Sequence, residues 1–122
     1  MLKNKNRLKN KRAFDATYKN RNVINSNCVA LYLGKEKQDK SCPTRVGFVV
    51  SKKVHKRAVK RNRIKRLMRE NIRLIFKNSK ENVLNNYISA IFSARASALE
   101  VNYLEMQQII ENLLDKLANK NV

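Results

Sequence analysis

Three short segments of the chain have the pattern of β-strands. Residues 28–33 and 45–50 alternate apolar side chains or are rich in β-branched residues, and residues 87–92 form a short apolar run. Side chains of a strand point alternately to opposite faces of a sheet, so these patterns predict strands. Residues 34–41 begin with a glycine and continue with polar residues, which predicts a hairpin loop between the first two strands. The first strand places three apolar side chains on one face: Val29, Leu31 and Leu33.

Other segments repeat apolar residues at the spacing of an α-helix. A short helix is expected to begin after Asn10, whose side chain can cap it, and to run through Tyr18. A longer helix is expected over residues 57–76, and a last helix after Asn102, where Glu105 completes a capping box. The apolar stripe of the longer helix contains Ile64, Leu67, Met68, Ile72 and Ile75. The stripe of the last helix contains Met106, Ile109, Ile110, Leu113, Leu114 and Leu117.

The order of these segments predicts a single α+β domain. A helix is followed by two or three strands, a basic helix, a strand and an amphipathic helix, which together form an α+β sandwich of one sheet with helices. The 122 residues suffice for one core, and a hydrophobic fraction of 43% argues against general disorder. No run of about 18 apolar residues exists, and no apolar stretch follows the charged N-terminus. We therefore expect no membrane span, no secretion signal and a cytoplasmic location.

Positive charge is concentrated in two blocks. The chain has 28 Lys and Arg against 9 Asp and Glu, a net charge of +19. Residues 1–21 hold eight cations and one acid, residues 45–73 hold twelve cations and one acid, and residues 78–122 hold four cations and five acids. This charge favours binding to a polyanion, with nucleic acid ahead of an anionic membrane surface; alternatively, the lysines only solvate the surface. The charge also predicts that residues 1–10 are flexible.

The basic helix has a polar face opposite its apolar stripe. At 100° per residue, its outward side chains fall within an arc of roughly 100°, with Arg61 and Arg63 at the flanks of the stripe. Guanidinium groups bind phosphates through paired hydrogen bonds, so this face predicts contact with a nucleic-acid backbone. The outward side chains belong to Asn62, Lys65, Arg66, Arg69 and Arg73.

Aromatic residues supply the second feature expected of a nucleic-acid interface. Phe14 and Tyr18, four residues apart, share one face of the first helix, and Tyr32 lies on the strand face opposite the apolar set. Exposed rings can stack on unpaired bases, but each ring could equally belong to the core, and the pattern leaves both options open. Rings beside an arginine-lined helix would suit single-stranded RNA better than a duplex.

Residues that could catalyse a reaction are nearly absent. His55 is the only histidine, lies among Lys and Arg, and lacks a neighbouring carboxylate to orient it. Cys28 and Cys42 are expected to be free thiols, because a zinc site would need two more ligands. The chain has no glycine-rich phosphate loop and no serine–histidine–aspartate order. The protein alone is therefore expected to bind rather than to catalyse, with no catalytic residue and no metal site.

Several short motifs occur in order along the chain. Residues 45–53 read RVGFVVSKK, and residues 61–63, within the basic helix, read RNR. Residues 6–8 read NRL, and residues 93–95 read SAR. This ordered set closely resembles the bacterial ribonuclease P protein component over essentially the whole chain. One departure is at residues 21–23, which lack the glycine often found after the first helix in that family.

The resemblance implies a fold, an assembly and a substrate. The fold is an α-β-β-β-α-β-α domain in which the strand–helix–strand crossover through the basic helix is left-handed, against the usual rule. The protein would be the subunit of a ribonucleoprotein endonuclease that removes the 5′ leader of precursor tRNA and so gives the mature tRNA 5′ end. A catalytic RNA subunit with bound Mg²⁺ would carry out the hydrolysis. No cofactor would be bound by the protein alone, and no protein partner would be required.

The resemblance also implies which residues make the contacts. Phe14, Tyr18 and Tyr32 would line a cleft for the leader. A ribosomal or general RNA-binding protein, or a basic nucleoid protein, would share the charge but would have neither a leader cleft nor partner-dependent cleavage. The residues implied to bind the RNA subunit are Lys52, Lys53, Arg57, Arg61, Asn62, Arg63, Lys65, Arg66 and Arg69.

Overall fold

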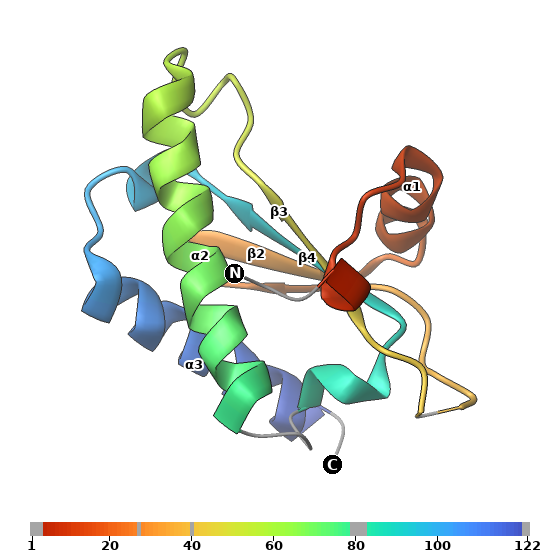
Figure 1. Cartoon of the computed structure of the whole chain (residues 1–122). Coiled ribbons are helices and arrows are strands. Elements are labelled where there is room, and N and C mark those ends of the chain that lie inside the picture. The colour runs from red at the N-terminus through yellow and green to blue at the C-terminus, as the bar shows by residue number, and fades with distance from the viewer. Residues whose placement is uncertain (1–3, 27, 40, 79–82, 121–122) are drawn as a thin grey trace.

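The helices and strands follow one another in the order α-β-β-β-α-β-α (Figure 1). A computed structural model describes residues 4–26, 28–39, 41–78 and 83–120. The elements are α1 (Lys11–Lys19), β1 (Asn22–Asn25), β2 (Val29–Leu33), β3 (Arg45–Val49), α2 (Ala58–Asn78), β4 (Ser89–Ala94) and α3 (Tyr103–Lys120). Short 3₁₀ helices lie at Asn4–Asn6, Val83–Asn86 and Ala96–Ala98. The order of elements implied by the family resemblance is confirmed.

The strands form one mixed sheet in the order β1-β2-β4-β3. All neighbouring pairs are antiparallel except β3 and β4, which are parallel and joined through α2. Seen from the α2 side with these parallel strands pointing up, β4 lies to the left of β3 (Figure 1). The crossover is therefore left-handed, as the resemblance implies, and departs from the right-handed rule.

The predicted hairpin between β2 and β3 is wrong. These strands are not neighbours, because β4 lies between them: Ala90 is paired with Leu33 on one side and with Val46 on the other. Ile91 and Phe92 of β4 are also fully buried. β4 is thus an interior strand with both edges paired and both faces covered, and the loop that joins β2 to β3 crosses its width.

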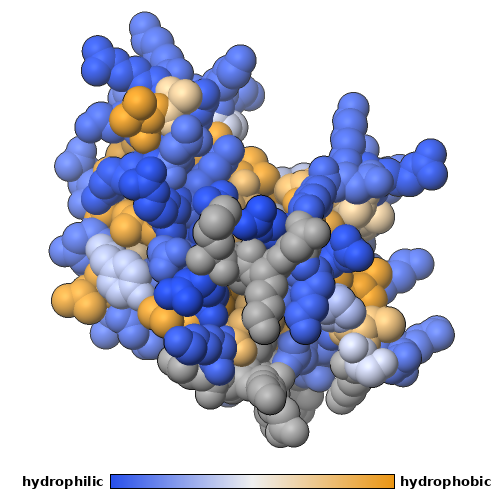
Figure 2. Space-filling model, in the orientation of Figure 1, coloured by the Kyte–Doolittle hydropathy of each residue, from blue (hydrophilic) through white to orange (hydrophobic). Residues whose placement is uncertain are grey.

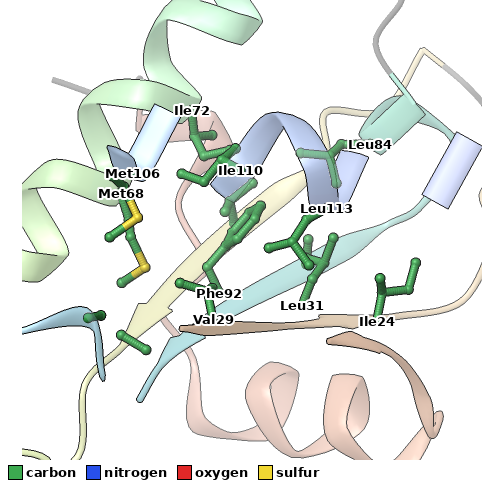
Figure 3. Packing of buried hydrophobic residues seen from close by; sticks show 14 of the residues in the cluster. Ile24, Val29, Leu31, Met68, Ile72, Leu84, Phe92, Met106, Ile110 and Leu113 are labelled. Atoms are coloured by element: carbon green, nitrogen blue, oxygen red, sulfur yellow. The ribbon is translucent and has the colours of Figure 1, made fainter. Parts of the chain in front are cut away.

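Helices cover both faces of the sheet. α2 and α3 pack on one face, and α1 packs on the other (Figures 1 and 3). The apolar stripes predicted for the long helices point into the core between the sheet and the α2–α3 layer (Figure 3). The residues of these stripes that are fully buried are Ile64, Met68, Ile72, Met106, Ile110, Leu113 and Leu117.

The helix caps predicted from the sequence are confirmed. The Asn10 side chain accepts a hydrogen bond of 2.8 Å from the backbone N–H of Arg12 at the start of α1. At the start of α3, the Glu105 N–H donates to the Asn102 side chain over 2.8 Å, and the Asn102 N–H donates to the Glu105 carboxylate over 3.2 Å. This reciprocal pair is the predicted capping box, and it satisfies two backbone donors that the helix cannot pair internally.

The chain before α1 runs along the outer edge of β3. The Leu8 N–H donates to the Val46 carbonyl over 2.9 Å, and the Asn6 side chain donates to the Thr44 carbonyl over 2.9 Å. Leu8 is buried. The flexibility expected of residues 1–10 stays a prediction, and residues 1–3 lie outside the described part of the chain.

Arg21, directly after α1, has a left-handed backbone conformation with φ of 55°. Its N–H donates to the Tyr18 carbonyl over 3.2 Å, which closes the last turn of the helix. Helices often end with such a residue, but it is usually Gly, because a Cβ at positive φ crowds the following carbonyl oxygen. The backbone at Arg21 is therefore locally strained.

Replacing Arg21 by Gly is expected to raise the free energy of unfolding by about 0.5–1 kcal/mol, because Gly adopts this conformation without the steric cost. Urea titration of the two proteins measures the difference. The matched control is Arg21→Gln, which removes the same charge but keeps a Cβ. A Gly variant no more stable than the Gln variant would show that the conformation is not strained.

Candidate nucleic-acid interface

Cations cover the outward side of α2 and the loop that leads into it. Hydrophilic side chains occupy this side of the molecule, and the surface is hollowed between the α2 side and the α1 side (Figure 2). The side chains of Arg57, Lys65 and Arg66 form no hydrogen bond or ion pair with any described residue. Their charges are therefore available to phosphate groups. A shallow pocket at the start of this surface is lined by Lys52, Lys53, Val54, His55, Lys56, Arg57 and Lys60.

His55 organises the loop between β3 and α2. Its Nδ1 accepts a hydrogen bond of 3.0 Å from the Arg57 N–H, and its carbonyl accepts one of 3.5 Å from the Arg61 guanidinium. Nδ1 must be unprotonated to accept, so this geometry selects the tautomer with the proton on Nε2. His55 thus fixes the turn that holds the loop cations beside the first turn of α2.

Two members of the predicted cationic set also have structural contacts. Arg63 donates to the carbonyl oxygens of Leu99 and Val101 over 3.4 and 2.9 Å, and so ties α2 to the segment before α3. The Arg69 guanidinium lies 5.9 Å from the centre of the Phe48 ring, within range of a cation–π contact. The sequence could not show these roles, because both depend on residues distant along the chain.

The predicted aromatic residues lie on the other face of the sheet. Tyr32 alternates with Leu31 and Leu33, whose side chains point into the core beneath α2, so its own ring points toward α1. Tyr18 of α1 meets it edge to face, with ring centres 4.9 Å apart and an interplanar angle of 76°. The expected placement of these rings beside the arginine-lined helix is therefore wrong: the sheet separates the rings from α2.

None of the three aromatic residues belongs to the buried core cluster. Tyr18 is 36% exposed, and Phe14 and Tyr32 are half-buried. Burial and the neighbouring Tyr32 raise the pKa of Tyr18, so its hydroxyl stays neutral at physiological pH. Of the two options that the sequence left open, the structure favours rings at a surface over rings in the main core.

Two glycines allow α1 to lie close to the sheet. A Cβ on Gly47 of β3 would lie 2.5 Å from Cζ of Phe14, so the ring packs directly on the strand backbone. A Cβ on Gly34, directly after β2, would collide with the Ser89 hydroxyl. The chain contains only 2 glycines, and both lie beneath this helix. The small number of glycines could have indicated, from the sequence, where a helix packs closely on the sheet.

Polar contacts fix the position of α1 on the sheet. Thr17 donates to the Ala13 carbonyl over 2.8 Å, so the buried Ser89 hydroxyl donates to Thr17 over 2.6 Å. The Asn20 side chain donates to the carbonyl oxygens of Leu33 and Gly34 over 3.1 and 3.0 Å. These residues set where Phe14 and Tyr18 stand, and sequence reasoning missed them because their partners are far along the chain.

Within residues 4–26, 28–39, 41–78 and 83–120, no group of three or more His, Cys, Asp or Glu side chains is placed to hold a metal ion. In the same ranges, no helix has the length and apolar character needed to span a bilayer.

Comparison with known proteins identifies the family. The family model for ribonuclease P matches residues 2–118. The chain belongs to the ribonuclease P protein family. A ribonuclease P protein component from Symbiobacterium thermophilum is 38% identical over 116 residues, covering 94% of this chain and 93% of the relative. One from Staphylococcus epidermidis is 38% identical over 118 residues and covers 95% of both.

Solved structures of ribonuclease P proteins have the same fold. The Staphylococcus aureus protein superimposes with a TM-score of 0.70 at 32% identity, covering 90% of this chain and 93% of the other. The Thermotoga maritima protein gives 0.70 at 24% identity, covering 90% and 96%, which shows likeness of fold alone. Membership of the ribonuclease P protein family assigns the chain to tRNA processing, as a component of a ribonucleoprotein with nuclease activity.

Arg63→Ala is expected to lower the free energy of unfolding by roughly 1–2 kcal/mol, because the variant loses charged hydrogen bonds to two carbonyl groups. Arg66→Ala, on the same helix but with no hydrogen bond or ion pair to any described residue, is the matched control and should stay within about 0.5 kcal/mol of the parent. Urea titration compares the two variants. Equal effects would show that the contacts of Arg63 contribute nothing to stability.

Proposed function

We propose that this chain is the protein subunit of ribonuclease P, which binds the catalytic RNA subunit and the 5′ leader of precursor tRNA and promotes endonucleolytic removal of that leader. The observation that carries the proposal is the pairing of two surfaces on one small domain. One presents cations along α2, of which Lys65 and Arg66 have no hydrogen bond or ion pair with a described residue, and the other presents accessible rings between α1 and β2. A folded RNA and an unpaired strand need these two kinds of surface respectively.

The RNA subunit would bind along α2 and its preceding loop. Each phosphate neutralised by a Lys or Arg releases condensed counterions, so the affinity would depend strongly on salt. Arg57 directly precedes α2, and Arg61 and Arg66 lie in its first three turns, so their side chains can contact phosphates at different points of the RNA backbone. The remaining contacts would come from Lys52, Lys53, Asn62, Arg63, Lys65 and Arg69.

The leader would bind on the α1 side of the sheet. The edge-to-face contact between Tyr18 and Tyr32 holds both rings in fixed orientations, so little entropy is lost when a base stacks on them. Phe14 lies one turn before Tyr18 and extends the row of rings. Stacking makes few demands on base identity, which suits a protein that must accept leaders of different sequence.

Hydrolysis would be carried out by the RNA subunit with bound Mg²⁺ rather than by protein side chains. Mg²⁺ prefers carboxylate and phosphate oxygens, and the described residues do not gather acidic side chains to hold it. The protein would supply affinity for the substrate and neutralise charge between two RNA molecules. We expect this reaction to take place in the cytoplasm, with no membrane and no further protein required.

The direct test mixes the protein with a bacterial ribonuclease P RNA and a precursor tRNA at modest Mg²⁺. The expected result is a mature tRNA with a 5′-phosphate that forms efficiently only when protein and RNA are both present. Competition with duplex DNA and unrelated structured RNA separates the alternatives. A general RNA-binding protein or a nucleoid protein would bind these competitors equally well and would not increase cleavage.

Tyr18→Ala is expected to weaken binding of leader-bearing precursor to the assembled ribonucleoprotein by about 5- to 30-fold, the loss of one stacking contact of roughly 1–2 kcal/mol. Binding of mature tRNA should not change. The matched control is Tyr103→Ala on α3, since both tyrosines are 36% exposed. Equal losses of Tyr18→Ala on precursor and mature tRNA would assign the ring a purely structural role.

A further inference from the structure

Arg21 combines a strained backbone with an unpartnered charge. Its φ is 55°, a conformation that Gly adopts at no steric cost. Its side chain is exposed and makes no hydrogen bond or ion pair with the described part of the chain. The protein therefore gains no internal contact from the guanidinium that would offset the strain. Non-glycine residues held in this conformation tend to occur at binding sites.

The position of Arg21 places it in line with the aromatic residues. Phe14 and Tyr18 are one turn apart on α1, and Arg21 follows three residues after Tyr18, directly beyond the helix. The next residue, Asn22, begins β1 and is paired with Leu33, while Val23 is paired with Tyr32. Arg21 thus stands at the end of the row of rings, beside the strand that carries Tyr32.

The end of α1 would otherwise repel a phosphate. The carboxyl end of a helix carries a partial negative charge from its last carbonyl groups. Lys19 and Arg21 both stand at this end, and Lys35 follows Gly34, whose carbonyl is bonded to Asn20. Cations here offset the partial negative charge of the helix end, next to the rings.

We propose that Arg21 binds a backbone phosphate of the leader, in the part of the strand that extends beyond the Tyr18–Tyr32 pair. This assignment rests on the proposed function, because it needs the leader to lie on the rings. It makes Arg21 a further substrate-binding residue of this chain. The contact lengthens the bound part of the leader rather than adding to base recognition.

The test measures binding of the reconstituted ribonucleoprotein to precursor tRNAs whose leaders are lengthened one nucleotide at a time. In the parent, affinity should rise with leader length until the phosphate opposite Arg21 is included. Arg21→Gly should stop this rise earlier and weaken binding of the longest leaders by about threefold to tenfold. The slope of log affinity against log salt should fall by about 0.7, the value for one phosphate contact to a single strand.

Further variants exclude other causes. Arg21→Gly is expected to be more stable than the parent, so unfolding cannot explain weaker binding. Arg21→Lys, which keeps the charge, should retain most of the affinity, and Arg21→Gln should behave as Arg21→Gly does. Lys77→Gln removes an exposed cation from the last turn of α2 and should bind all leaders as the parent does.

The outcomes distinguish a failure of the role proposed for Arg21 from a failure of the proposed function. If the parent prefers leader-bearing precursor to mature tRNA but Arg21→Gly binds every leader as the parent does, the role of Arg21 is overturned and the proposed function stands. An equal loss in Lys77→Gln would also overturn it, since net charge alone would then account for the effect. If the parent shows no preference for precursor, the proposed function fails, and the role of Arg21 fails with it.

Discussion

The structure depends on the burial of β4 on both faces. Phe92 and Ala90 point into the core beneath α2 and α3, while Ile91 and Ser89 point toward α1, and all four are buried. A strand buried on both sides must have a layer on each face. This is why α1 lies opposite the other helices, and why the molecule presents two working surfaces instead of one.

The two surfaces differ in the physical chemistry that they offer. The α2 side presents cations whose attraction is long-ranged and weakened by salt, which suits a large folded RNA. The α1 side presents rings held in place by Gly47, by the Thr17–Ser89 hydrogen bond and by Asn20. Their attraction is short-ranged and insensitive to salt, which suits a flexible strand already delivered to the surface. Under the proposed function, separate surfaces would let both RNA molecules bind at once.

Features of the fold that depend on the spacing of neighbouring residues could be predicted from the sequence. The stripes of α2 and α3, the caps at Asn10 and Asn102, and the strands β2 and β3 follow from neighbouring residues, whereas β4 begins at Ser89, two residues after its predicted start. The hairpin prediction failed because pairing of β4 between β2 and β3 is decided by burial over long sequence distances. β1 was not located, because its four residues bury only Ile24. For the candidate site, residue types were predictable, whereas the separation of rings from cations and the carbonyl contacts of Arg63 were not.

Charge is distributed unequally over the chain. The acidic residues of the C-terminal third include Glu105, Glu111 and Asp115 on α3, and the cations gather on the N-terminal segment, α1 and α2. In the field of a polyanion such a molecule experiences a torque as well as an attraction. The protein is therefore oriented before it makes contact with the polyanion. Productive collisions then become a larger share of all collisions, and the association rate rises above that of an evenly charged protein of the same size.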